Sequence, residues 1–177
     1  GVDTAWQVAD AGIVSLAAAA GGDGALGFLT GAGFERNGGR VSLFLRALYS
    51  SEDFAQLGTD GLEDRPKLRG FGGLGFELGR WGNLQVSYGQ QSNWTTPSNE
   101  TIALSHSVEL GDWGYLNFIA SRSTSEESST DLFLNWTRPF GERRNASMSV
   151  QHTPDAVYEE QTVAAATLQQ SLPAGSG

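Results

Sequence analysis

The chain contains no cysteine, a single methionine and few basic residues. Without cysteine it has neither a disulfide framework nor a thiolate metal site. It has 11 Lys and Arg against 20 Asp and Glu, a formal net charge of -9. That balance argues against binding nucleic-acid phosphates, which needs clustered basic side chains. No segment approaches the roughly 20 apolar residues of a membrane-spanning helix. The alanine-rich stretch from Leu16 to Ala20 is far too short, so a helical membrane protein is excluded.

The composition is unusual for a soluble core but not for a β-structure. Hydrophobic residues are 39% of the 177 residues and the mean hydropathy is -0.26, which is little apolar material for a globular domain. Yet 5 Trp, 9 Phe and 4 Tyr accompany 24 Gly, and disordered segments lack so many aromatic residues. We expect residues 1–177 to form one domain or part of one. No secretion signal opens the chain and it ends abruptly, so we expect a fragment or processed product.

Apolar and polar residues alternate with a period of two from end to end, between stretches rich in Gly, Asn and Asp. This pattern predicts an all-β fold, an antiparallel up-and-down meander of about ten long strands. Most of them contain about 9 to 11 residues, more than a usual soluble strand and enough for a tilted crossing of a bilayer. The expected ranges are 2–8, 13–20, 26–36, 40–49, 67–78, 83–91, 100–110, 115–123, 130–140, 145–153 and 162–172.

The connections between these strands alternate in length. Tight turns are expected at 10–12, 37–39, 79–82, 111–114 and 141–144, and most of the intervening links are longer, above all 50–66 and 92–99. Transmembrane barrels have short turns on one side of the membrane and longer loops on the other. The motif Glu-Leu-Gly-x-Trp-Gly occurs at 77–82 and again at 109–114, and 139–142 repeats it loosely. A period of about 30 residues fits a repeated hairpin better than a propeller blade or a solenoid coil.

The alternation also assigns two faces. We predict that the apolar positions face lipid, while the opposite positions carry small polar residues that suit a water-filled lumen. A solvated sheet packed on a soluble core alternates in the same way, and strand length and the alternating connections favour the membrane. Trp81, Trp113 and Phe140 lie at three short turns, where aromatic side chains of a membrane interface are expected. The predicted lipid-facing residues are Leu84, Val86, Tyr88, Leu116, Phe118, Leu132, Leu134 and Trp136.

Two residues fit this assignment poorly. His106 falls between Leu104 and Val108, and Arg138 falls just beyond Trp136. An arginine near the interface can extend its charge towards water, whereas a histidine in the middle of a bilayer cannot. Either the face is wrongly assigned at His106 or this strand meets other protein.

No arrangement of residues predicts catalysis, a metal or a cofactor. Gly70–Gly75 has the spacing G-x-G-x-x-G, but it begins a strand and no helix follows. His106 and His152 lack a cluster of further ligands, and Asp60–Asp64 lacks the spacing of an EF-hand. We therefore expect no enzyme activity and no catalytic, cofactor or metal residues.

Several stretches resemble the barrel of fimbrial ushers, outer-membrane proteins of the chaperone–usher pathway, and the archaic type is the most similar. They are Pro139-Phe140-Gly141 with the basic residues and alternating strand that follow, Leu172-Pro173-Ala174-Gly175, and Gly38–Leu43 followed by Tyr49–Phe54. The resemblance implies a segment of a large transmembrane β-barrel of about two dozen strands in the bacterial outer membrane. It also implies pilus subunits, periplasmic chaperone–subunit complexes and outer-membrane lipid as partners. The family's plug and periplasmic domains are not recognisable in this chain.

The expected function is therefore that of a wall segment of a pore that assembles and secretes pilus subunits. Two other hypotheses stay open. One is a small autonomous outer-membrane barrel, acting as a porin or a lipid-processing enzyme, and the other is a secreted adhesive β-sandwich. A porin would close with its own strands, and an enzyme would need a Ser/His/Asp-type cluster that the sequence does not offer.

Overall fold

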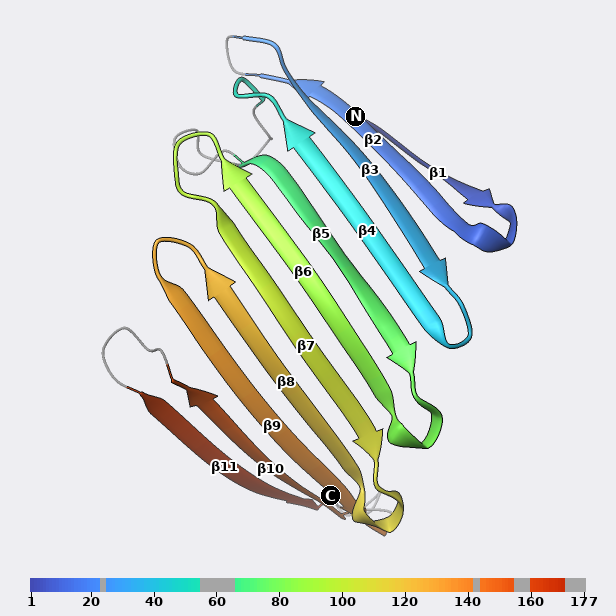
Figure 1. The fold of residues 1–177 in the computed structure, drawn as a ribbon, viewed down its shortest axis with the longest axis vertical. Coiled ribbons are helices and arrows are strands. Elements are labelled where there is room, and N and C mark those ends of the chain that lie inside the picture. The colour runs from blue at the N-terminus through green and yellow to red at the C-terminus, as the bar shows by residue number, and fades with distance from the viewer. Residues whose placement is uncertain (23–24, 55–65, 142–143, 155–159, 171–177) are drawn as a thin grey trace, which may run out of the picture.

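The computed structural model describes residues 1–22, 25–54, 66–141, 144–154 and 160–170. In these residues the chain forms one sheet of eleven antiparallel strands that pair in chain order. Figure 1 shows them side by side, with β1 at one edge of the sheet and β11 at the other. The predicted all-β antiparallel meander is confirmed. The two edge strands do not pair with each other, so the sheet is not closed.

Each strand begins and ends within two residues of its predicted range, and all but the first contain 10 to 13 residues. The strands are β1 (Val2–Val8), β2 (Gly12–Gly21), β3 (Gly27–Asn37), β4 (Val41–Ser50), β5 (Pro66–Glu77), β6 (Asn83–Asn93), β7 (Asn99–Glu109), β8 (Tyr115–Thr124), β9 (Ser128–Phe140), β10 (Arg144–Thr153) and β11 (Gln161–Gln170). The pattern of period two placed them well because one side of each strand is consistently more apolar than the other.

The connections lie alternately at two ends of the sheet (Figure 1). At the end that we call the short-turn end, β1 is linked to β2, β3 to β4, and so on to β9 and β10. The other end is called the loop end, and its links differ in length. The shortest is 125–127, between β8 and β9, and the longest is 51–65, between β4 and β5. The expected alternation of short and long links is therefore only partly met. The links 22–26 and 94–98 are no longer than the turns 78–82 and 110–114, and 125–127 is shorter, so the long link expected at 92–99 is wrong.

The repeated motif folds twice into the same turn. The 3₁₀ helices η2 (Gly79–Trp81) and η3 (Gly111–Trp113) lie in these turns, and η1 (Ala9–Ala11) lies between β1 and β2. In both repeats the leucine N–H donates to the carbonyl oxygen of the last glycine at 2.7 Å. The last glycines, Gly82 and Gly114, have φ of +81° and +87°, a conformation that favours glycine. A Cβ on Gly82 would lie 1.9 Å from the carbonyl oxygen of Ser107 in β7, and a Cβ on Gly114 would lie 2.1 Å from that of Thr137 in β9. Both turns therefore require glycine at this position.

The sheet has no core. No hydrophobic side chain in the described part of the chain is buried. The accessible surface is 12747 Å², whereas a compact soluble protein of 18.8 kDa exposes about 8300 Å². None of the helices among the described residues is long and apolar enough to cross a membrane. The described strands thus form a layer that is open on both faces, with no second sheet packed on it.

Candidate functional site

The strand register decides which side chains share a face, since directly paired residues of antiparallel strands project to the same side. Leu84 pairs with His106, His106 with Phe118, Phe118 with Leu134, and Leu134 with Val150. The other residue pairs of these strands follow the same rule. The register therefore puts all eight predicted lipid-facing residues on one face, which we call the apolar face: Leu84, Val86, Tyr88, Leu116, Phe118, Leu132, Leu134 and Trp136.

The apolar face carries no Asp, Glu, Lys or Arg in the middle of any described strand. Its charged residues all lie within three residues of a strand end: Arg36, Glu100, Arg122, Arg138 and Arg144. Between them the face is built mainly from aliphatic, aromatic, alanine and glycine residues, and its polar residues include Thr4, Thr30, Gln90 and His106. It is hollowed over β3 to β6 by a depression of about 650 Å³. Small residues make the hollow, namely Ala32, Ala47, Gly70 and Gly72.

The opposite side, called the polar face, has a different chemistry. Hydrogen bonds link polar side chains along it, from Arg69 Nε to Gln91 Oε1 at 2.9 Å and from Thr137 Oγ1 to Asn135 Oδ1 at 3.2 Å. Arg46 lies here in the middle of β4. The face is not uniformly polar, because Phe44 and Phe71 contact each other with ring centroids 6.2 Å apart. In the described strands, a mid-strand charge thus occurs on this face alone.

The three predicted interfacial aromatic residues lie at the short-turn end. Trp81 and Trp113 belong to η2 and η3 and are 63% and 65% exposed, and Phe140 is the last residue of β9. Their assignment to a membrane interface stays a prediction. The repeat puts Trp81 and Trp113 at the same place in successive hairpins, whereas Phe140 occupies the place of Leu78 and Leu110.

His106 and Trp136 occupy equivalent positions in successive repeats. Each is paired with the leucine that lies two residues after the last glycine of a turn. His106 Nε2 donates to the carbonyl oxygen of Trp81 at 2.8 Å, and Trp136 Nε1 donates to that of Trp113 at 2.8 Å. His106 is therefore on the apolar face, as its sequence position predicted, but near the short-turn end rather than in mid-strand. The register thus puts His106 on the same face as Leu84, and the assignment of that face to lipid at this position stays a prediction.

Arg138 lies on the apolar face between two aromatic rings. Its guanidinium carbon is 5.0 Å from the ring centroid of Trp113 and 4.8 Å from that of Phe140. Its Nε is enclosed and has no hydrogen-bond partner in the described residues. Arg80 stacks on Trp81 at 5.0 Å in the preceding repeat. Cation–π contacts thus accompany both tryptophan turns.

A second aromatic group, at the loop end, was not predicted. Trp94, the first residue after β6, donates from Nε1 to the carbonyl oxygen of Ser50 at 3.2 Å, and Lys67 Nζ lies 4.7 Å from its ring centroid. Phe28 and Tyr49 contact each other nearby in the sheet, with centroids 5.9 Å apart. The signal available in the sequence was aromatic residues at strand ends opposite the tryptophan turns. Aromatic residues therefore occur at both ends of the strands.

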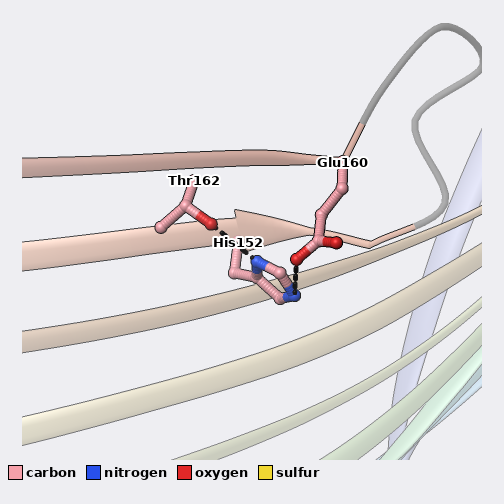
Figure 2. Close-up of polar contacts among 3 residues, drawn as sticks. All are labelled: His152, Glu160 and Thr162. Carbon is pink, nitrogen blue, oxygen red and sulfur yellow. Dashed lines mark hydrogen bonds and ion pairs between the residues drawn. The ribbon is translucent and has the colours of Figure 1, made fainter.

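The two histidines lie at opposite ends of the sheet. His152 of β10 contacts Thr162 in β11 and Glu160 just before it (Figure 2): its Nδ1 is 2.8 Å from Thr162 Oγ1, and its Nε2 is 3.8 Å from Glu160 Oε1. No group of three or more His, Asp or Glu side chains in the ranges that the structure describes is placed to hold a metal ion. Asp60–Asp64 lies outside those ranges.

Neither a protein-family model, nor a curated protein, nor a solved structure matches this chain. The likeness to usher barrels therefore rests on the sequence motifs alone. Of those motifs, Leu172–Gly175 lies outside the described residues.

Proposed function

We propose that this sheet is part of the wall of a transmembrane β-barrel in the bacterial outer membrane, with its apolar face against lipid and its polar face towards an aqueous lumen. One observation carries the proposal: mid-strand charge is absent from one face of a core-less sheet and present on the other. Lipid cannot satisfy polar groups, whereas water in a lumen can. Ten residues rising about 3.3 Å each, in a strand tilted by about 40°, span about 25 Å, the height of the lipid-facing band of such barrels.

Barrel closure constrains the proposal further. Every connection reverses the chain direction, so β1 and β11 run in the same direction and cannot pair antiparallel with each other. Bacterial single-chain barrels have an even number of antiparallel strands. Closure therefore requires an odd number of strands beyond the eleven described. This disfavours a small autonomous barrel made from these strands. The described residues form one sheet with no second sheet packed on it, which disfavours an adhesive β-sandwich.

Within this class we propose the translocation pore of a fimbrial usher, in which pilus subunits pass along the polar face. The support is the likeness of Pro139-Phe140-Gly141, and of Gly38–Leu43 followed by Tyr49–Phe54, to usher barrels, together with the need for further strands. Short polar side chains offer a passing subunit a weakly adhesive surface. The chain itself does no chemistry in this proposal, since subunit polymerisation moves the cargo.

The wall is tested by cysteine accessibility, for which a chain without cysteine is a ready background. Single cysteines are placed at each of positions 116–121 of β8, and the protein in outer-membrane vesicles is treated with a membrane-impermeant maleimide. We expect labelling at 117, 119 and 121, on the polar face, and protection at 116, 118 and 120. Equal labelling at all six positions would overturn the membrane wall.

The usher assignment needs a separate test. A photo-crosslinking amino acid at Asn117 is compared with one at Phe118, in cells that export pilus subunits. We expect a crosslink to a subunit from Asn117 and none from Phe118. If the cysteine pattern holds and neither position crosslinks a subunit, the wall stands and the usher assignment fails.

A further inference from the structure

We propose that the short-turn edge of the apolar face binds the phosphate headgroup of an anionic phospholipid, with Arg138 and Arg144 as its ligands. The inference rests on the proposed membrane wall, because that wall places this edge at the depth of lipid headgroups. The lipid site adds a specific partner that the pore function does not require.

The first observation is that charges are sorted by face at the short-turn end. The strand-end arginines, Arg36, Arg138 and Arg144, project to the apolar face. The strand-end glutamates, Glu35, Glu77 and Glu109, project to the polar face. The chain as a whole is acidic, at -9, so a basic rim on the lipid side is a local feature. It creates a positive edge where phosphate groups of a bilayer would lie.

The second observation is the geometry of Arg138. Its guanidinium lies over the rings of Trp113 and Phe140, and its Nε is enclosed without a hydrogen-bond partner among the described residues. No carboxylate of the described chain forms an ion pair with it. A stacked guanidinium still presents its terminal N–H groups in one plane, the arrangement that binds a phosphate through two hydrogen bonds.

Arg144 completes the site from the next strand. It pairs directly with Phe140, while Arg138 pairs with Ala146, so the two arginines are diagonal neighbours on the same face. Diagonal neighbours are about 7–8 Å apart in an antiparallel sheet, near enough for two long side chains to share one phosphate. Of the two residues that adjoin both arginines on this face, Ala146 is small and Phe140 contacts Arg138 through its ring.

The surroundings of the site favour a lipid over a free anion. Trp136 and Met148 continue the apolar face directly from the arginines towards mid-strand. An occupant that satisfies the whole surface has a phosphate at one end and hydrocarbon beside it, as a phospholipid does. An unpaired arginine facing hydrocarbon is costly, which is a further reason for its charge to meet a headgroup.

The test measures lipid retention on the full-length protein. The protein is reconstituted with equal amounts of phosphatidylglycerol and phosphatidylcholine, returned to detergent, and the retained lipids are counted by native mass spectrometry. We expect the unchanged protein to retain phosphatidylglycerol preferentially. Each of Arg138→Gln and Arg144→Gln should weaken this retention about five-fold. The matched controls, Arg46→Gln on the polar face and Arg122→Gln at the loop end, should leave it unchanged.

Three results would overturn the lipid site: no preference for phosphatidylglycerol, an equal loss in the Arg46→Gln control, or displacement of the lipid by inorganic phosphate alone. Quenching of tryptophan fluorescence by phosphatidylcholine brominated on its acyl chains reports insertion without regard to headgroup charge, and it also shows that each variant has folded. Quenching without a headgroup preference refutes this site only. Absence of quenching in the unchanged protein refutes the membrane wall.

Discussion

The two ends of the sheet are built differently, although the same strands run between them. At the short-turn end, one turn occurs twice with the same hydrogen bonds, and each tryptophan carbonyl accepts an N–H from the following hairpin. At the loop end the links range from 125–127 to 51–65, and the contacts of Trp94 and His152 are not repeated. A tight turn fixes the register of its hairpin, so the opposite connection is free to vary in length. The short-turn end therefore organises the sheet.

The sharpest way to break this organisation is to fill the space at the last glycine of a turn. Gly114→Ala forces a side chain into a left-handed conformation at φ +87° and against the carbonyl oxygen of Thr137. Strain and steric overlap together should cost about 4 kcal/mol. The control is Gly111→Ala, whose φ is +60° but whose Cβ would meet nothing within 4 Å, with an expected cost of about 1–2 kcal/mol. Urea unfolding in lipid vesicles measures both, and equal losses would refute the role of the close approach.

A charge placed mid-strand compares the two faces directly. Ala120 and Ser121 are adjacent small residues in β8 that project to opposite faces. Ala120→Arg puts a guanidinium beside Leu104 and Leu132, and it should cost about 2–4 kcal/mol if this face meets the bilayer midplane. Ser121→Arg faces Asp131 and should change the free energy of folding by less than about 1 kcal/mol. The same vesicle titration measures both, and similar losses in the two variants would contradict a difference between the faces.

The fold was predictable from the sequence because each strand has one apolar side. The resulting period of two can be recognised without knowing which strands pair. Leu84, Leu116 and Leu134 could thus be assigned to one face before any register was known. The repeated Leu-Gly-x-Trp-Gly motif likewise predicted equivalent turns. The predicted number of strands was approximate, because the alternation of apolar and polar residues does not mark where one strand ends and the next begins.

The roles of His106 and Arg138 were not predictable in the same way. The hydrogen bond of His106 depends on which residue lies opposite Leu84, which is a property of the register and not of the local sequence. The stacking of Arg138 depends on Trp113, which is 25 positions away in the chain and belongs to a different hairpin. Sequence patterns report which face a residue occupies, but contacts between hairpins require the paired sheet.

Two tryptophan hydrogen bonds, one at each end of the sheet, allow the two ends to be compared with a smaller expected effect on stability. Trp136→Phe keeps an aromatic ring and removes the N–H that meets the carbonyl of Trp113. We expect a loss of about 1–2 kcal/mol if this face forms the proposed membrane wall, where water is scarce. The matched change at the loop end is Trp94→Phe, which removes the longer bond to Ser50. It should cost about 0.5 kcal/mol, near the lower limit for a single hydrogen bond. If Trp94→Phe proved the more damaging change under urea, the short-turn end would not be the better fixed of the two.

The smallest effect is expected at the contact between His152 and Glu160. The two side chains are 3.8 Å apart, Glu160 is 70% exposed, and the histidine has a closer partner in Thr162 (Figure 2). Glu160→Gln should therefore change the free energy of unfolding by less than about 0.5 kcal/mol, because exposed ion pairs contribute little. Thr162→Val removes the 2.8 Å hydrogen bond and serves as the comparison within the same hairpin. Comparing the urea midpoints of the two variants tests this, and a larger loss from Glu160→Gln would mean that charge, rather than the cross-strand hydrogen bond, secures the loop end of β10 and β11.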